Sequence, residues 1–342
     1  MKICICGGGN LGHVTAGYFA AQEDIQVSLL TTKPELWSQY LEVVDGEGKT
    51  YKGKVEKISS NPQEVIPEAD IVLICLPGYA IHDVLCSISP WLNIKTWMGT
   101  VVSSTGFFFE AMKVLPKEQP LFGFQRVPFI SRIINYGHIA ELKGYKESLS
   151  VAVEQTANKE FIRGTLEKLF NTPIKLLDSY YEVSLSNSNP LLHTARLYTM
   201  WKDWVPGTSY DKNPEFYSDW TIEAAELLIE MDEEFQTLLR KIGLKKGAIP
   251  SVLQYYESSD AKSLTMKLQS IPAFKGISSP MVVNKYGKYE PDFSSRYFTE
   301  DFPYGMRFII ETAHQYNVDI PIIEKVYKWE MNINNGRRKF KA

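Results

Sequence analysis

The chain has 342 residues, of which 44% are hydrophobic and 23% are charged, and its formal net charge at pH 7 is −3. This length predicts one or two domains, and the composition is that of an ordinary globular protein. The small negative charge gives no reason to expect nucleic acid or an anionic membrane as a partner. The sequence contains no run of about 18 apolar residues that could span a bilayer, and its N-terminal apolar run stops at Gly7, too early for a signal peptide. We therefore expect a cytoplasmic protein.

The first expected element is a strand that leads through a glycine-rich turn into a helix. Residues 3–6 are apolar and run into the pattern Gly-x-Gly-x-x-Gly, after which small and apolar residues recur at helical spacing. In dinucleotide-binding folds the first glycine permits the tight turn, the second lets a pyrophosphate approach the backbone, and the third lets the helix pack on the strand. The helix N-terminus then attracts the phosphates. The alternative is a glycine-rich turn without a ligand. The candidate nucleotide-binding residues here are Gly7, Gly9, Asn10, Leu11 and Gly12.

The end of the second expected strand, residues 25–30, favours NADP over NAD. Folds that use NAD carry an acidic residue at this point for the ribose 2′-hydroxyl. This chain has Thr31, Thr32 and Lys33 there, and hydroxyls with an ammonium group suit a 2′-phosphate. Glu35 is near enough to keep NAD as the alternative. In the structural alternative the threonines only cap a helix and Lys33 is solvated.

Further alternation of strands and helices predicts an α/β, Rossmann-type doubly wound domain. Residues 71–76 form a continuous apolar run, typical of a strand covered on both faces, and a helix is expected at 80–86. Ligands of such sheets bind beyond the carboxyl ends of the strands, so Leu76 and Pro77 are also candidate cofactor-binding residues. Further strands are expected at 100–103 and 121–124, and an antiparallel hairpin is expected from residues 139–142 and 149–153.

The pattern changes near Leu185, after which amphipathic helical stretches follow at 221–242, 309–316 and 322–331. We therefore assign residues 1–182 to an NAD(P)-binding domain and residues 183–342 to an all-α domain for substrate binding and catalysis. Residues 276–292, rich in Gly, Pro, Ser and Asn, predict a loop. An apolar face of the second domain is either core or the surface of a homodimer. The basic cluster at 337–341 is interpreted as a solvated terminus.

Two polar segments of the second domain hold candidate catalytic residues. In the first, Asn189 is expected to cap a helix whose first turn holds Pro190, and His193 follows one turn later. In the second, Arg296 and Asp301 lie among aromatic residues just before a helix. Judged locally, such a histidine is more often a packing or surface residue, and the second segment is more often a helix cap.

Both segments resemble the octopine/nopaline (opine) dehydrogenase family. The similarity consists of Asn-Pro-x-x-His at residues 189–193 and Arg-Tyr-x-Thr-Glu-Asp-x-Pro-x-Gly at residues 296–305. Weaker similarities lie at 127–133, 142–146 and 215–217, although Phe129 stands where the family commonly has Trp. The resemblance implies an NAD(P)H-dependent reductive condensation of an amino acid with an α-keto acid, which are small-molecule substrates.

The resemblance also implies roles for individual residues, with His193 and Asp301 as the catalytic pair and Arg296 at a substrate carboxylate. Imidazole accepts and donates protons near neutral pH, and a carboxylate orients the ring. Arginine suits bidentate binding of a carboxylate. Asn189 and Gln125 are weaker substrate-binding candidates, with helix capping and a hydrogen bond at the sheet end as their structural alternatives.

Two other functions stay open. Ketopantoate reductases and related hydroxyacid dehydrogenases pair a similar nucleotide domain with helices, but they typically use a Lys or Glu, and the Asn-Pro-x-x-His segment argues against them. A non-catalytic NADPH-sensing protein would explain the glycine motif but would leave His193, Arg296 and Asp301 unused. No metal site is expected, because Cys4, Cys6 and Cys75 fall in predicted strands as core residues.

Overall fold

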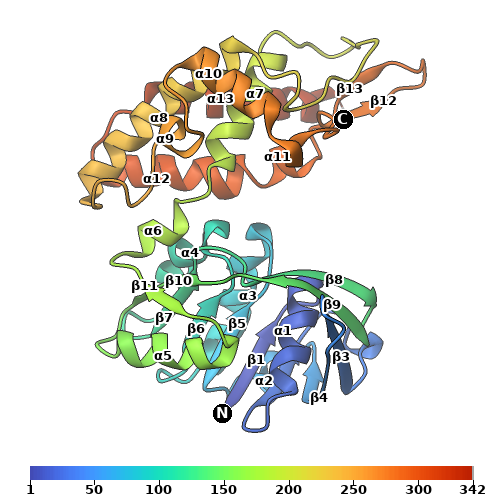
Figure 1. The fold of residues 1–342 in the computed structure, drawn as a ribbon, viewed down its shortest axis with the longest axis vertical. Coiled ribbons are helices and arrows are strands. Elements are labelled where there is room, and N and C mark those ends of the chain that lie inside the picture. The colour runs from blue at the N-terminus through green and yellow to red at the C-terminus, as the bar shows by residue number, and fades with distance from the viewer. Residues whose placement is uncertain (341–342) are drawn as a thin grey trace. The chain divides into compact units, whose positions relative to one another are not determined.

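The computed structural model describes residues 1–340, with side chains described as far as residue 333, so the basic cluster at 337–341 lies outside the described side chains. The chain divides into two compact units, of which the first is Met1–Ser186 and the second begins at Asn187. Figure 1 shows the strands of the first unit in blue to green and the helices of the second in yellow-green to red. No described helix is long and apolar enough to cross a membrane.

The first unit is built on an 11-stranded sheet with the order β11-β10-β7-β6-β5-β1-β2-β4-β3-β9-β8. Its central strands are parallel, and the order reverses between β1 and β5, where doubly wound sheets bind their ligands. This confirms the predicted Rossmann-type fold. The parallel strands are β1 (Lys2–Cys6), β2 (Gln26–Leu30), β4 (Thr50–Ser59), β5 (Ile71–Ile74), β6 (Trp97–Thr100) and β7 (Leu121–Phe124).

Helices cover both faces of this sheet, and β1 shows why. Its residues Ile3 and Ile5 belong to one buried cluster, whereas Cys4 and Cys6 belong to another, because alternate side chains of a strand point to opposite faces. The first cluster includes Val14 and Phe19 of α1, and the second includes residues of α3 and α4. The helices of this unit are α1 (Asn10–Ala20), α2 (Pro62–Val65), α3 (Gly78–Ile88), α4 (Phe107–Val114), α5 (Lys159–Phe170) and α6 (Tyr180–Ser184).

The predicted hairpin of residues 139–142 and 149–153 is wrong. Both segments are strands, β9 (Ile139–Tyr145) and β10 (Leu149–Glu154), but they lie on opposite sides of the sheet. β9 pairs with β8 (Phe129–Asn135) and β3 (Tyr40–Asp45), whereas β10 pairs with β7 and β11 (Ile174–Leu176). The hairpin partner of β9 is thus β8, the strand that precedes it in sequence, and not the strand that follows it.

The strand predicted at 100–103 is β6 in the structure, and it begins and ends about three residues earlier than expected. Met98 and Gly99 pair with β5 and β7, and Ser103 already starts a 3₁₀ turn, η3 (Ser103–Thr105). Val101 is fully buried although it lies beyond the strand. The apolar side chain of Val101 is therefore buried beyond the end of the strand rather than within it.

The second unit is helical, as predicted. The long helix α8 (Ile222–Ile242) packs against α7 (Asn189–Trp201), and the carboxylate of Glu234 in α8 accepts hydrogen bonds from the backbone N–H groups of Ile322 and Ile323 at the start of α13. The predicted loop at 276–292 is wrong in one respect, because it contains a small hairpin of β12 (Met281–Val283) and β13 (Tyr289–Pro291). The remaining helices are α9 (Val252–Tyr255), α10 (Ala261–Ser270), α11 (Arg296–Thr299), α12 (Arg307–Gln315) and α13 (Pro321–Phe340).

Candidate active site

The glycine motif lies between β1 and α1 and leaves no room for side chains at two of its three glycines. Gly7 has a φ of +131°, and a Cβ on Gly12 would lie 2.0 Å from the carbonyl oxygen of Gly7. At Gly9, by contrast, a Cβ would meet nothing within 4 Å. Gly7 and Gly12 are therefore required by the turn itself, whereas Gly9 keeps open space at the helix N-terminus.

This open N-terminus fits a dinucleotide. The helix α1 starts directly after Gly9 and carries no acidic residue in its first turn. The backbone N–H groups and the helix dipole thus face no competing carboxylate and suit a pyrophosphate. Leu11 is half-buried in the same turn.

Hydrogen bonds from the β8–β9 hairpin hold the glycine loop in place. The Asn10 side-chain oxygen accepts a hydrogen bond from the backbone N–H of Ile133 at 2.8 Å. His13 is buried, with Nδ1 3.0 Å from the carbonyl of Gly9 and Nε2 accepting from the backbone N–H of Gly137 at 2.8 Å. His13 therefore has a buried, structural position at the glycine loop. The Asn10 side chain holds the hairpin, and the sequence carried no signal of this.

The predicted selectivity residues follow β2. Thr32 and Lys33 are exposed, whereas Thr31 is buried and its hydroxyl lies 3.5 Å from the backbone N–H of Lys33. The half-buried Leu76 and Pro77 follow β5 and precede α3, beside the point where the strand order reverses. Hence the predicted cofactor-binding residues lie at the carboxyl ends of β1, β2 and β5.

In the second unit, the structure brings His193 and Asp301 together, 108 residues apart in sequence. Nδ1 of His193 lies 2.7 Å from a carboxylate oxygen of Asp301. Only 11% of the His193 side chain and 14% of the Asp301 side chain are exposed. An ionised carboxylate only accepts hydrogen bonds, so the proton of the neutral imidazole resides on Nδ1 and the lone pair on Nε2. Such a pair suits general acid–base chemistry.

Tyr217 completes the surroundings of His193, although the sequence indicated no acid–base role for it. Its hydroxyl lies 2.8 Å from Nε2 of the imidazole. Burial raises the pKa of Tyr217, so this hydroxyl stays protonated and donates to Nε2. The rings of Phe216 and Tyr297 also contact the imidazole, with centroids 5.6 and 4.6 Å away. The only available signal was the similarity of residues 215–217 to a family segment.

Asp301 reaches His193 because its segment packs directly on the start of α7. After Asp301 the backbone forms a π-helical turn, η5 (Phe302–Met306), in which the N–H of Met306 bonds the carbonyl of Asp301. A Cβ on Gly305 would lie 2.4 Å from Cγ of Pro190. Pro190 and Gly305 therefore set the approach that lets the Asp301 carboxylate meet the imidazole.

The three predicted substrate-binding residues have different surroundings. The Arg296 side chain is 84% exposed, and its guanidinium forms two hydrogen bonds to Glu300, at 2.8 and 3.0 Å. Asn189 is the first residue of α7, so the predicted N-cap is off by one position; the N-cap is Ser188. The amide of Gln125 donates to the carbonyl of Glu182 at 3.3 Å. The roles of these residues in substrate binding stay predictions.

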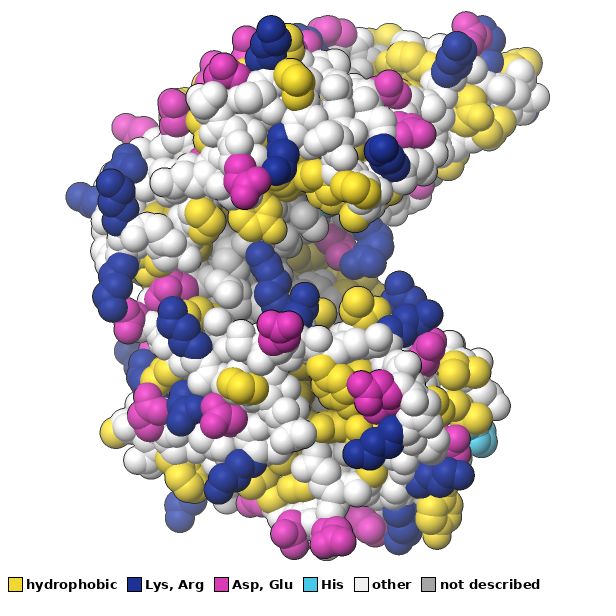
Figure 2. All heavy atoms as spheres, in the orientation of Figure 1, with side chains coloured by type: hydrophobic (Ala, Val, Ile, Leu, Met, Phe, Trp, Pro, Cys, Tyr) yellow, Lys and Arg dark blue, Asp and Glu magenta, His cyan; other side chains and the backbone are white. Residues whose placement is uncertain are grey.

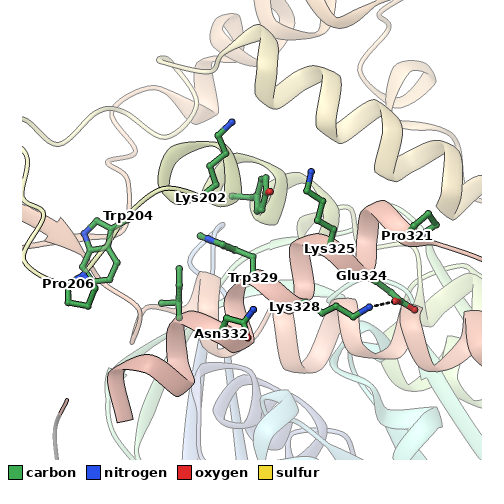
Figure 3. Close-up of a pocket in the computed structure, with 11 residues that line it drawn as sticks. Lys202, Trp204, Pro206, Pro321, Glu324, Lys325, Lys328, Trp329 and Asn332 are labelled. Atoms are coloured by element: carbon green, nitrogen blue, oxygen red, sulfur yellow. Dashed lines mark hydrogen bonds and ion pairs between the residues drawn. The ribbon is translucent and has the colours of Figure 1, made fainter. Parts of the chain in front are cut away.

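A cavity of about 700 Å³ lies elsewhere in the second unit, between α7 and α13. Figure 3 shows its lysines and aromatic side chains. Lys202 pairs with Glu223 at 2.7 Å and Lys328 with Glu324 at 2.5 Å. Because Lys202 and Lys328 are already paired locally and none of the predicted site residues lines the cavity, we assign it no ligand.

The described residues show no metal-binding cluster, and the face of the molecule drawn in Figure 2 carries charges of both signs. Among the described residues, no group of three or more His, Cys, Asp or Glu side chains is placed to hold a metal ion. On the face drawn in Figure 2, basic and acidic side chains are interspersed. This face therefore offers no broad basic surface of the kind that binds nucleic acid.

Comparison with known proteins gives a consistent set of relatives. A sequence profile described as "NAD/NADP octopine/nopaline dehydrogenase, alpha-helical domain" matches residues 176–334. The chain is 28% identical to the tauropine dehydrogenase of Arabella iricolor, over 97% of this chain and 91% of that protein. It is 26% identical to the opine dehydrogenase of Haliotis discus hannai, over 96% and 89%. A solved octopine dehydrogenase in complex with NADH and agmatine superposes with a TM-score of 0.82 at 25% identity, over 97% and 89% of the two chains.

Proposed function

Because the chain belongs to the octopine/nopaline dehydrogenase family, we propose that it is an opine dehydrogenase. It condenses the α-amine of an amino acid with an α-keto acid and reduces the resulting imine, and it depends on NAD(P)H. The observation that carries this proposal is the pairing of His193 with Asp301 at 2.7 Å, inside the helical unit that the family profile matches.

His193 is the acid–base group of the proposed reaction. On the Nε2 side of its ring, the imidazole takes a proton from the substrate ammonium, which frees the amine for attack on the keto carbon. It returns a proton to the hydroxyl of the carbinolamine, which leaves as water. Asp301 holds the ring through Nδ1 and stabilises the protonated imidazole between these two steps.

The first unit would hold the nicotinamide dinucleotide. Gly7, Gly9 and Gly12 shape the turn for the pyrophosphate, and Asn10 and Leu11 lie in the helical turn that follows. Thr32 and Lys33 are exposed at the end of β2 and suit a 2′-phosphate, so we propose NADPH as the preferred form. When bound, the cofactor supplies the hydride that reduces the imine carbon.

The substrates are small molecules, and several residues are proposed to recognise them. Arg296 would pair with a substrate carboxylate, which requires it to exchange its present partner Glu300. Asn189 and Gln125 offer amide groups for hydrogen bonds to the substrates. A cytoplasmic location and a homodimer remain predictions of the sequence.

The test is oxidation of NADPH, and separately of NADH, with a matrix of amino acids and keto acids. Arginine, taurine and alanine are paired with pyruvate and 2-oxoglutarate, and every keto acid is also run without an amine. We expect turnover only when both substrates are present, with a secondary-amine product identified by mass spectrometry. Equal turnover without the amine would instead indicate a hydroxyacid dehydrogenase.

Replacement of His193 tests the proposed acid–base role. We expect His193→Ala to lower kcat by about 10²–10⁴-fold, the usual contribution of general acid–base catalysis, while NADPH binding is kept. His314→Ala is the matched control, because His314 is an exposed helical histidine that pairs with Glu324. Normal turnover in His193→Ala would contradict the proposed mechanism.

A further inference from the structure

Both ring nitrogens of His193 already have protein partners. Nδ1 faces Asp301 at 2.7 Å and Nε2 faces the hydroxyl of Tyr217 at 2.8 Å. A substrate that exchanges protons with the imidazole must therefore either displace Tyr217 or act through its hydroxyl.

Displacement of Tyr217 is unfavourable because its ring is held by other aromatic rings. The ring stacks on Phe274 with centroids 4.0 Å apart and an interplanar angle of 16°. It is also nearly parallel to Trp220, at 6.1 Å and 9°. Only 5% of Tyr217 is exposed. To move the hydroxyl away from Nε2, the protein would have to give up these ring contacts.

Trp220 is itself held in place. The guanidinium of Arg196, a buried residue one turn after His193 in α7, lies 5.9 Å from the Trp220 ring and donates to the carbonyl of Asp219 at 2.6 Å. The ring that supports Tyr217 is thus linked to the same helix that carries His193. The contact between the hydroxyl and Nε2 is therefore fixed from both sides.

We propose that the Tyr217 hydroxyl relays protons between His193 and the substrate. This inference rests on the proposed function and adds to it a second catalytic residue. A phenol suits the task because its oxygen can accept one hydrogen bond while its O–H donates another.

The relay conserves protons both when it delivers a proton to the substrate and when it removes one. In the acid step, the proton on Nε2 of the imidazolium moves to the Tyr217 oxygen while the phenol proton moves to the carbinolamine hydroxyl. The C–O bond breaks as water leaves, and the nitrogen lone pair forms the C=N bond of the protonated imine, which carries the positive charge that the imidazolium has given up. In the base step, a substrate ammonium gives its proton to the Tyr217 oxygen while the phenol proton moves to Nε2.

The first test is Tyr217→Phe, which keeps the stacked ring and removes only the hydroxyl. We expect kcat to fall by about 10²-fold or more, with little change in NADPH affinity. Tyr198→Phe is the matched control, because Tyr198 lies on α7, the helix that carries His193, with its ring against Trp329. A kcat of Tyr217→Phe equal to that of the control would overturn the relay.

The second test separates a relay from a positioning role. Fluorinated tyrosines placed at position 217 keep the shape of the ring but make the phenol more acidic. A relay predicts that kcat changes steadily with the acidity of the phenol, whereas a kcat independent of it would overturn the proposal. If the unmodified enzyme forms no secondary amine with any substrate pair, the proposed function fails instead, and this outcome is distinct from a failure of the relay.

Discussion

Two buried histidines of this chain differ in the protonation state of the ring that their hydrogen-bond partners favour. His193 faces the carboxylate of Asp301, which stabilises a protonated ring. His13 faces the carbonyl of Gly9 and the backbone N–H of Gly137, and the second contact requires Nε2 to be an acceptor. Only the neutral ring meets that requirement. The partners thus suit His193 to proton transfer and His13 to a fixed structural role.

The neutral state of His13 predicts a pH dependence of stability. Burial lowers its pKa in the folded protein below the ordinary value of 6.5. As the pH falls through 6.5, the unfolded chain binds a proton that the folded chain does not, so the free energy of unfolding decreases. The loss continues down to the lowered pKa of the folded state. Urea denaturation of the wild type at neutral and at mildly acidic pH measures this decrease.

The control for this prediction is His13→Gln, which removes the titrating group. We expect the stability of this variant to depend less on pH over the same range than that of the wild type. An identical dependence in both proteins would show that other groups cause the decrease.

At the level of elements, the close contact of η5 with α7 predicts the effect of Gly305→Ala. The new methyl group would lie 2.4 Å from Cγ of Pro190, so the two segments must separate. Overpacking of this kind costs about 1–3 kcal/mol, and the 2.7 Å contact between His193 and Asp301 should lengthen. We expect a lower free energy of unfolding together with a lower kcat, measured by denaturation and by steady-state kinetics.

Gly164→Ala is the matched control for that substitution. Gly164 lies within α5, and a Cβ there would meet nothing within 4 Å. Alanine in a helix interior is favoured over glycine by about 1 kcal/mol, so this variant should be at least as stable as the wild type. Equal kcat and stability in Gly305→Ala and the wild type would exclude the steric link.

The sequence predicted elements well where the pattern was local. Strands at the start of the chain and at 71–76 were recognised because buried parallel strands are continuous apolar runs. The strands β3 and β8 escaped, since both lie in the outer part of the sheet and mix polar with apolar residues. The pairing of β9 was predicted wrongly because β8, the strand just before it, was not recognised, and its other partner, β3, lies far away in the sequence.

The candidate site was predictable to the extent that its residues belong to recognisable motifs. His193 and Asp301 were singled out by two such segments, and the structure places them in contact. Tyr217 was not, because an aromatic residue in an irregular segment is usually core, and only the fold brings its hydroxyl to Nε2. The exposure of Arg296 and its pairing with Glu300 likewise depend on side-chain geometry.

At the scale of the whole molecule, the two compact units divide the proposed work, with the nucleotide in the first and the acid–base pair in the second. Gly9→Ala tests this division. The backbone of Gly9, at φ −85° and ψ −175°, suits alanine, and the methyl group would meet no protein atom within 4 Å. We expect the variant to keep the wild-type Tm without ligand but to lose the rise in Tm that NADPH gives.

The size of the rise in Tm that NADPH gives follows from mass action. A ligand at a hundred times its Kd stabilises the folded protein by about 2.7 kcal/mol. The rise should persist in His193→Ala and in Gly144→Ala, a control glycine of the same unit with open space around it. An undiminished rise in Gly9→Ala would place the nucleotide elsewhere.

The hydrogen bonds that join the glycine loop to the β8–β9 hairpin also bear on how this protein is made. They connect Asn10 to Ile133 and His13 to Gly137, across 123 and 124 residues of chain. During synthesis the N-terminal strand and helix emerge first, but the hairpin that fixes their loop emerges much later. We expect the nascent chain to acquire its nucleotide loop only after the hairpin has been synthesised, so the first motif in the sequence is not the first part to take its final form.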